Sequence, residues 1–573
     1  MNTLLKKIWK LKTPYQNIPL LDRVTKHRDL DLQNELSEYH SPWLLKNMEI
    51  AVKRVQKAIK DRERIMIYGD YDVDGIVGSS ILYLGLKDLG ANVSVRLPHR
   101  EKDGYGLNQK IISECHELGV NLLITVDCGI SNVEEIEIGN KLGVDTIITD
   151  HHSIPPQLPG AFAILNPKQK DCKYPEKEIV GAVVALKLLT ALSEKFLGSS
   201  GFSPLGSPEQ SHGVRGRESV GGQENFPKNY LDLAALATVA DCAPLTGENR
   251  LIVKNGLLQF EHSQHRGLRT LVTSNQLTSN QLTSYHLGYI IGPCVNAAGR
   301  IEDPLLAFKA MTGDETKAKE LIEINRERQN ILRTALIEAN ELVEKYHSQD
   351  QILIFWNEHW QPGIIGLLAG KLCEQYNRPA ICLTKNKDIY IGSCRSIPEI
   401  NIIEELNKHS ELFINFGGHA QAAGLSLTPE NLEIFRSGIT QNIADFVKKN
   451  PIESALNIDT EIQTPEIKLE TSKQLSRLEP FGIGNPKPKF LLKNVKLNAS
   501  RPVGKTGAHL KFSLSKDGQL FPGIGFNLAE HEDTLKEWQN LDIVCQLNTN
   551  EFNGKVSVDV QMVDAKNSEE TRK

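Results

Sequence analysis

Short apolar runs alternate with segments of helical apolar spacing between residues 64 and 150. The runs read as buried strands and lie at Ile65–Tyr68, Val93–Leu97, Asn121–Val126 and Val144–Thr149. The segments between them, such as Ile76–Leu89 and Asn108–Leu118, carry apolar residues at the helical period. Strands that alternate with helices predict a mostly parallel sheet with helices on both faces.

The same alternation returns after a long helical stretch from Pro304 to Tyr346, which is broken near Gly313. A predicted helix at Gly363–Tyr376 accompanies strands expected at Ile352–Trp356, Ala380–Leu383 and Ile389–Ser393. Beyond Pro465 the pattern changes to short strands with turns, at Val495–Leu497, Leu510–Leu514 and Ser557–Val563. We therefore expect a second α/β domain followed by a small β-barrel of the OB type.

These patterns predict an α/β protein of several domains. A polar lead-in covers residues 1–60 and ends in a predicted helix at Pro42–Lys60. The first α/β domain covers 61–303, the connecting helix 304–347, the second α/β domain 348–450 and the barrel 451–565. Residues 197–226 lack apolar periodicity and read as a flexible insertion, and residues 566–573 read as a disordered tail.

Composition limits the class of protein. A chain of 573 residues suits about three or four domains. A run of about eighteen apolar residues is missing, so no membrane span is expected, and the basic start lacks a cleavage site, so a cytoplasmic location is expected. The nine cysteines form no C-x-x-C pair, which predicts reduced thiols and no structural zinc. The net charge of -5 does not indicate nucleic-acid binding, but a local basic face remains compatible with it.

Three carboxylates follow the first strand at every second position. Asp70, Asp72 and Asp74 stand between this strand and the next helix, where their mutual repulsion calls for a divalent cation. One or two such residues are more often helix caps, but three weaken that interpretation. An EF-hand loop is disfavoured because Ile81 stands at the twelfth position, where that loop needs Glu.

Later strands also end in groups that can bind a metal. Asp127 follows one strand, and Asp150, His151 and His152 follow the next. Carboxyl ends of parallel strands line one crevice, so these groups can converge, and Asp241 follows a predicted helix at Tyr230–Val239. The candidate ligands are Asp72, Asp74, Asp127, His151 and Asp241.

This ligand set can hold two divalent ions with a bridging carboxylate. Oxygen-rich ligation with one imidazole favours manganese or magnesium over zinc. Two ions about 4 Å apart suit hydrolytic displacement at phosphorus. The expected reaction is hydrolysis of a phosphate ester or a phosphoanhydride.

Three further segments read as loops that contact a substrate backbone. The first, Ile290–Pro304, offers Asn296 and Arg300 to phosphate oxygens, although a tight turn explains it equally. The second, Gly392–Ser396, places Ser393 two residues before Arg395, and the third, Phe416–Gly424, contains His419. For these two loops, a structural role and a functional one are evenly matched. In the barrel, a basic groove for single-stranded nucleic acid is expected from Arg501, Lys505, His509 and Lys511.

A series of motifs resembles one family. In order along the chain these are YGDYDVDG, VDCGIS, TDHH, TVADCAPLTGENR, NAAGR, GSCRS, GGHAQAAG and LEPFGIGNPKPKF. The series resembles the RecJ family of the DHH phosphoesterase superfamily, from about Ser41 to Val563. The resemblance makes the first α/β domain a DHH domain and the second a DHHA1-type domain.

The resemblance also implies an activity: 5′ to 3′ hydrolysis of single-stranded DNA to mononucleotides, in DNA repair and recombination. It implies two Mn²⁺ or Mg²⁺ ions on the five ligands named above, with Asp127 as the bridge and His152 beside them as a catalytic residue. Ser393, Arg395 and Arg100 would hold a 5′ phosphate, and His419 would contact the DNA backbone. A monomer without membrane contact is expected, with a single-strand-binding protein and a helicase as candidate partners.

Two positions depart from the family pattern. Tyr68 stands where superfamily relatives often carry His, and Cys294 stands where an Arg is expected before NAAGR. One alternative function is a phosphodiesterase for short oligonucleotides or cyclic dinucleotides, which would not need the barrel. A second is a non-catalytic DNA-binding scaffold, which would not need the full ligand set.

Overall fold

The computed structural model describes residues 3–12, 18–30, 32, 36–100, 103–104, 106–198, 227–278, 281–552 and 555–569. Most of the predicted insertion at 197–226 therefore lies outside the described residues. The chain forms two compact units. One contains residues 36–449 with 482–484, and the other contains residues 1–35, 450–481 and 485–573. None of the described helices is both long and apolar enough to span a membrane.

The larger unit contains a parallel sheet, as predicted, and this sheet has five strands. Its strands are β2 (Arg64–Gly69), β3 (Asn92–Arg96), β4 (Leu122–Val126), β5 (Asp145–Thr149) and β6 (Ala163–Leu165). Their order in the sheet is β3-β2-β4-β5-β6. The short strand β6 was not expected from the sequence.

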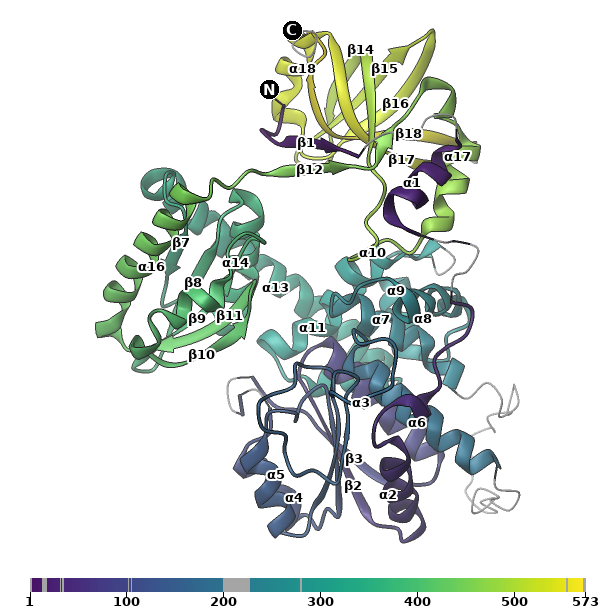
Figure 1. Cartoon of the computed structure of the whole chain (residues 1–573), viewed down its shortest axis with the longest axis vertical. Helices are drawn as coiled ribbons and strands as arrows, with labels where there is room; N and C mark the ends of the chain where they lie inside the picture. Colours follow the sequence, from purple (N-terminus) through teal and green to yellow (C-terminus); the bar gives the residue numbers. More distant parts are fainter. Residues whose placement is uncertain are drawn as a thin grey trace. The chain divides into compact units, whose positions relative to one another are not determined.

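Both faces of this sheet are buried, because side chains of β2 alternate between two apolar clusters. Ile65 and Ile67 face the cluster around α3 (Val73–Asp88) and α6 (Gly181–Gly198). Met66 and Tyr68 face the opposite cluster. In Figure 1, α4 (Gln109–Glu117) and α5 (Val133–Lys141) cover one side of the sheet, and α2 (Met48–Lys60) lies on the other. This two-sided burial explains the nearly continuous apolar runs of the strands.

A helical layer follows the sheet. It contains α7 (Leu231–Ala240), α8 (Gly247–Gln259), α9 (Arg266–Ser274), α10 (Ser284–His286), the π-helical turn η6 (Leu287–Ile291), α11 (Gly292–Ile301) and α12 (Leu305–Met311). The long helix α13 (Glu315–Leu342) begins after Gly313, whose φ of 118° ends α12, and it runs into a second π-helical turn, η7 (Val343–His347). This confirms the predicted break.

Most of the segment Ile290–Pro304 is helical, from the end of the π-helical turn through α11 to Ile301, so the expected loop was wrong. Its small residues are needed for packing, because a Cβ on Gly299 would lie 2.2 Å from the carbonyl oxygen of Tyr71. Helix α11 therefore lies directly against the backbone of the acidic segment that follows β2.

The second α/β region has a mixed sheet. Strands β7 (Leu353–Trp356), β8 (Ala380–Asn386), β9 (Ile389–Arg395), β10 (Phe413–His419) and β11 (Ala422–Leu427) adopt the order β10-β11-β9-β8-β7. Helices α14 (Pro362–Tyr376), α15 (Ile402–Asn407) and α16 (Pro429–Lys449) belong to it.

Two segments predicted as loops belong to this sheet. GSCRS lies almost entirely within β9, which pairs with β8 on one side and β11 on the other. FGGHAQAAG forms the hairpin of β10 and β11. Of the β-branched and aromatic residues that favour strands, GSCRS has none and FGGHAQAAG has only Phe416, so pairing with neighbouring strands determines their conformation.

The C-terminal region forms the expected barrel. Its sheet has the order β13-β14-β15-β16-β18-β17, and an additional pairing of β14 with β17 closes it. The strands are β13 (Thr460–Glu461), β14 (Phe490–Val503), β15 (His509–Lys516), β16 (Gln519–Gly525), β17 (Asn540–Phe552) and β18 (Lys555–Asn567), with helices α17 (Leu469–Leu475) and α18 (Glu532–Trp538). Strand β18 includes Lys566 and Asn567, and the Ser568 hydroxyl donates to Asp542 Oδ1 at 2.8 Å. The predicted tail therefore begins too early, and residues 570–573 lie outside the described residues.

The first thirty residues belong to the barrel unit, which corrects the single lead-in predicted for 1–60. Strand β1 (Ile8–Leu11) pairs in parallel with β12 (Ala455–Ile458). Helix α1 (Leu20–Arg28) buries Leu20, Leu21 and Val24 in the barrel core. At its end, Arg28 forms a bidentate pair with Asp459, from Nε to Oδ1 at 2.8 Å and from Nη2 to Oδ2 at 2.9 Å.

We expect Arg28→Met to destabilise the barrel unit by about 2–4 kcal/mol, since it leaves a largely buried carboxylate without its partner. Both side chains of the pair are only 10% exposed. Differential scanning calorimetry measures the change. The control is Lys468→Ala, which removes the exposed pair with Glu470 in the same unit and should have little effect. Equal shifts for the two variants would contradict the assigned role of Arg28.

Candidate metal centre and phosphate site

The carboxyl ends of β2, β4 and β5 bring the predicted acids and histidines to one edge of the parallel sheet. From β2 the chain first adds β3 on one side and then β4 on the other. Open parallel sheets bind ligands at this point of reversal, because the connecting segments diverge there. Asp70 to Asp74 follow β2, Asp127 follows β4, and Asp150 to His152 follow β5.

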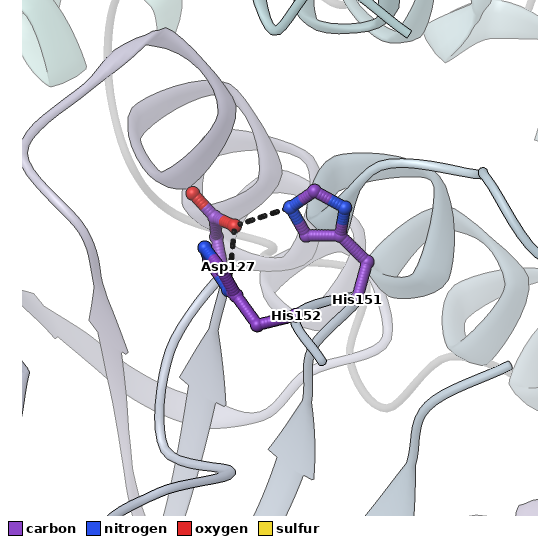
Figure 2. A group of neighbouring side chains, drawn as sticks. All are labelled: Asp127, His151 and His152. Carbon is purple, nitrogen blue, oxygen red and sulfur yellow. Dashed lines mark ion pairs between the residues drawn. The ribbon is translucent and has the colours of Figure 1, made fainter. Parts of the chain in front are cut away.

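His151 lies at the centre of this group. Its Nε2 is 3.0 Å from Asp127 Oδ1, 3.7 Å from Asp241 Oδ2 and 3.8 Å from Asp74 Oδ2. Figure 2 shows Asp127 facing both His151 and His152. Three sets of side chains each bring their ligand atoms within 4.8 Å of one another: Asp127 with His151 and His152, Asp74 with His151 and Asp241, and Asp70 with Asp72 and Asp127. Asp127 is thus shared between two neighbouring sets.

Backbone amides hold two of the acids in place. Asp74 accepts hydrogen bonds from the amides of Gly181 and Ala182, at 2.6 and 2.8 Å, at the first turn of α6. Asp72 caps α3 by accepting from the amides of Asp74 and Gly75. Gly181 is required there, because a Cβ would lie 2.7 Å from the Cβ of Asp127.

Asp127 has a left-handed backbone conformation, with φ at 60°. Asp and Asn adopt this conformation more readily than other residues with a Cβ. Its Oδ1 is buried yet accepts no hydrogen bond from the described residues, and the same is true of Asp70 Oδ1. A buried carboxylate oxygen without a donor is costly unless a cation satisfies it.

The carboxylates raise one another's pKa values. Burial and the neighbouring Asp72 raise the pKa of Asp70 to about 8. Burial and the other acids raise the pKa values of Asp74 and Asp127 well above their ordinary range, and that of Asp241 to about 7. Divalent cations would relieve this repulsion and keep the acids ionised. The donor set therefore fits Mn²⁺ or Mg²⁺, which prefer oxygen ligands.

The two histidines differ in charge. Burial and the neighbouring His152 lower the pKa of His151 to about 3, so its imidazole is neutral, as a metal ligand must be. Burial also disfavours the charged form of His152. The hydrogen bond to Asp150 and the nearby acids outweigh that effect and raise the pKa of His152 to about 9.

Asp150 orients this pair, a role that the sequence did not reveal. Its carboxylate accepts from the amides of Ile130, His151 and His152, and it lies 2.8 Å from His152 Nδ1. Burial disfavours its charge, but these hydrogen bonds outweigh burial and lower its pKa.

A group of arginines lies in the same unit. Arg300, on α11, is partly buried, and burial together with the charges of Arg100, Arg328 and Arg395 lowers its pKa to about 9. Arg100 stacks over the ring of Tyr71 at 4.2 Å and donates to the carbonyl of Gly299. Among the described residues, none of these four arginines forms an ion pair with a carboxylate. Such a surplus of positive charge favours an anion such as phosphate.

Neighbouring side chains complete this group. The Arg395 guanidinium donates to the Ser393 hydroxyl at 3.2 Å, so the two side chains lie together. Gly366 of α14 makes room for both, since a Cβ there would lie 2.9 Å from Ser393 Oγ. Asn296, on α11, has a buried Oδ1 without a donor. His419 is exposed at the end of β10, and within the described chain no hydrogen bond joins it to the carboxylates.

The structure explains both departures from the family pattern, Tyr68 and Cys294. Tyr68 lies in the core on the opposite face of the sheet, where its hydroxyl donates to the carbonyl of Gly106 at 2.9 Å. Asp70 joins the cluster instead, although the sequence interpretation left it out of the ligand set. The regular spacing of the three acids was the signal for it.

Cys294 is buried beside Asn325, whose amide nitrogen lies 3.4 Å from its sulfur. Arg328, one turn further along α13, donates to Asn325 Oδ1 at 3.0 Å. The positive charge that Cys294 lacks is therefore supplied by a different helix. No local sequence signal indicated Arg328, because nothing around it is distinctive.

Family models match three parts of the chain: "DHH family, N-terminal domain" at residues 64–238, "DHHA1 domain" at 349–445 and "RecJ OB domain" at 458–564. The single-stranded-DNA-specific exonuclease RecJ of Bacillus subtilis is 33% identical over 94% of this chain and 66% of its own length. The RecJ of Dickeya dadantii is 32% identical over 90% of this chain and 89% of its own length.

Solved structures agree. The crystal structure of RecJ in complex with Mn²⁺ from Thermus thermophilus matches with a TM-score of 0.80 and 27% identity, over 98% of this chain and 80% of that one. A crystal structure of exonuclease RecJ bound to manganese matches with a TM-score of 0.57 and 30% identity, over 70% of this chain and 95% of that one. These matches confirm the predicted combination of a DHH domain, a second α/β domain of the DHHA1 type and an OB-type barrel.

We expect Asp127→Asn to raise the melting temperature of the metal-free protein, since it removes one charge from a crowded set of buried acids and Asn tolerates the backbone conformation. The same variant should lose the stabilisation that Mn²⁺ confers on the unmodified protein. Thermal unfolding with and without Mn²⁺ measures both effects.

Asp150→Asn is the matched control. It should lower the melting temperature without metal, because the Asp150 carboxylate accepts several hydrogen bonds and is stabilised as an anion. If both variants shifted the metal-free melting temperature in the same direction, the repulsion assigned to Asp127 would be wrong.

Proposed function

This chain belongs to the RecJ family of single-stranded-DNA-specific exonucleases, and from that premise we propose that it removes mononucleotides from the 5′ end of single-stranded DNA. One observation supports this function above the others. Two sets of buried and partly buried side chains that could hold a metal share Asp127, and the same unit contains an arginine group that forms no ion pair with a carboxylate among the described residues. An acidic centre for cations beside a basic centre for phosphate suits the hydrolysis of a phosphodiester near a strand end.

We assign the metal ligands as Asp72, Asp74, Asp127, His151 and Asp241, with Asp127 as the bridge. Asp70 joins this set on the strength of its buried oxygen without a donor. These residues would hold two divalent ions, which would supply the activation of a water and the stabilisation of the leaving oxygen. The remaining steps depend on residues of the chain.

His152 acts as a charged hydrogen-bond donor in this proposal. Its Nδ1 proton is held by Asp150, so the proton on its other ring nitrogen can donate to an oxygen of the scissile phosphate. A group that is already cationic at neutral pH stabilises the negative charge that grows on the phosphate during attack.

The 5′ phosphate would be held by Arg100, Ser393 and Arg395, with Arg300 and Arg328 adding positive charge. A fixed terminal phosphate sets the direction of degradation, because the first phosphodiester then lies at the metal centre. Asn296 and His419 would contact the backbone near the cleavage point. The hydrogen bond between Arg395 and Ser393 supports a shared role of these two side chains in holding the phosphate.

The barrel would guide the rest of the strand. Arg501 pairs in register with Lys511, and Val503 with His509, on neighbouring strands β14 and β15. OB barrels bind single strands on such surfaces. We also propose that the chain acts as a monomer in the cytoplasm, in DNA repair and recombination, with a single-strand-binding protein and a helicase as partners.

Two other functions fit the chain less well. A phosphodiesterase for short oligonucleotides or cyclic dinucleotides has no need of the barrel, and a silent DNA-binding scaffold has no need of an intact acidic set. The presence of both features in one chain favours the exonuclease.

A strand with a 5′ phosphate and a 3′ label tests the function directly. We expect progressive shortening with Mn²⁺, none after chelation and none for a duplex. Cleavage of dinucleotides without shortening of the strand would favour the small-substrate enzyme. Binding without any hydrolysis would favour the scaffold.

Arg395→Ala should reduce the preference for a 5′ phosphate over a 5′ hydroxyl by about tenfold or more, since a charged hydrogen bond is lost. The ratio of kcat/KM values for the two strands measures this preference. Lys385→Ala is the control, because Lys385 is an exposed residue of the adjacent strand β8 that pairs with Glu358. An unchanged ratio in the Arg395 variant would remove that residue from the phosphate site.

A further inference from the structure

Two exposed tyrosines stack on each other just before α11. Tyr285 is 61% exposed and Tyr289 is 72% exposed. Their ring centroids are 5.0 Å apart, and the ring planes differ by 25°. Aromatic rings of this size are usually buried at least in part, because leaving them in water forgoes their hydrophobic stabilisation. Stacked rings that face solvent therefore offer a ready surface for a further flat, apolar group.

The local structure holds both rings in place. Thr283 and His286 form a reciprocal capping box that starts the helical run, and the π-helical turn Leu287–Ile291 follows. Leu287 and Ile291 are fully buried, so this turn is anchored on its inner side while Tyr289 points outward. π-helical turns within α-helices occur frequently at functional sites.

The same turn packs against the end of α7. A Cβ on Gly288 would lie 3.2 Å from Val239 Cγ1, and a Cβ on Gly292 would lie 3.4 Å from Ala240 Cβ. Asp241, one of the metal-binding acids, directly follows Ala240. The stacked tyrosines are thus carried by an element in contact with the helix that delivers an acid to the metal centre.

The helical run also leads to the arginine group. It continues without a break from Ser284 through α11 to Arg300. Arg300 lies about three helical turns beyond Tyr289, roughly 15 Å along the axis. A single strand with bases spaced about 3.4 Å apart covers that length in roughly four or five nucleotides, and an extended strand covers it in fewer.

We propose that Tyr285 and Tyr289 form a stacking platform for bases of single-stranded DNA, a few nucleotides downstream of the 5′ end. This inference rests on the proposed function and adds a subsite to it. Stacking suits an enzyme that removes nucleotides one after another, because every base has a flat face and the contact tolerates any sequence. The arginines grip the terminal phosphate, and the tyrosines hold the following bases.

The test compares the double variant Tyr285→Ala, Tyr289→Ala with Tyr285→Phe, Tyr289→Phe. Both positions are exposed, so either variant should fold, which circular dichroism checks. The Ala variant should bind a 5′-phosphorylated twelve-nucleotide strand about tenfold or more weakly in the presence of Ca²⁺. The Phe variant should retain the affinity, because it keeps the rings.

Tyr346→Ala is the matched control. Tyr346 is 62% exposed and also lies on a π-helical turn, Val343–His347, but it is not stacked on another tyrosine. It should bind the twelve-nucleotide strand normally. A 5′-phosphorylated dinucleotide ends before the platform, so its hydrolysis should change by less than about twofold in the Ala variant. An equal loss on the dinucleotide would mean that the tyrosines act through the helix, and would overturn the proposal.

Abasic strands show whether bases are the groups bound. With the unmodified protein, removing single bases within the first several nucleotides should weaken binding only at one window of neighbouring positions along the strand. In the Ala variant that window should disappear, because the ring partners are gone. Unchanged affinity of the Ala variant, or persistence of the window, would overturn the platform while leaving the exonuclease intact. Failure of the unmodified protein to shorten any strand would instead overturn the proposed function itself.

Discussion

Mutual repulsion among buried carboxylates is the constraint on which this structure depends. Asp70, Asp74 and Asp127 are buried at the end of one sheet, where burial and neighbouring acids raise their pKa values. The fold tolerates these buried acids because neighbouring groups offset part of the free energy of their repulsion. The amides at the start of α6 hold Asp74, and a charged His152 lies beside the cluster. The repulsion that remains is what divalent cations would relieve, so the mutual repulsion of the acids and their affinity for metal have one physical origin.

Close backbone approach connects the acidic centre to the rest of the larger unit. Gly181 lets α6 touch Asp127, and Gly299 lets α11 lie on the backbone of Tyr71. Gly363 lies against the carbonyl of Arg300, which brings the mixed-sheet region to the same place. These contacts place a surplus of guanidinium groups near a surplus of carboxylates, and among the described residues no ion pair joins the two. A substrate that carries both a phosphate to be cleaved and a phosphate to be held would satisfy both groups at once.

Much of the fold and of the candidate site could be predicted from the sequence, and the wrong predictions have one cause in common. The parallel sheet, the long helix with its break at Gly313 and the barrel follow from periodicity, which is a local property. The segments IIGPCVNAAGR, GSCRS and FGGHAQAAG were taken for loops, and they are a helix, a strand and a hairpin. Their small residues carry little propensity of their own. They signal close packing, and only the neighbouring element decides which conformation that packing requires.

The sequence by itself determined the alternation of strands and helices and the positions of the acids that follow strands, because both are encoded in the spacing of side chains along a few turns. Only the tertiary structure decided that residues 3–30 belong to the barrel, that Asp70 joins the cluster and that Tyr68 leaves it. Only the tertiary structure reveals that Arg328 lies near Cys294 and that Tyr285 stacks on Tyr289. Each of these depends on which side chains meet across large sequence separations, or on which face of an element remains in water. Packing determines such contacts collectively, and no single segment encodes them.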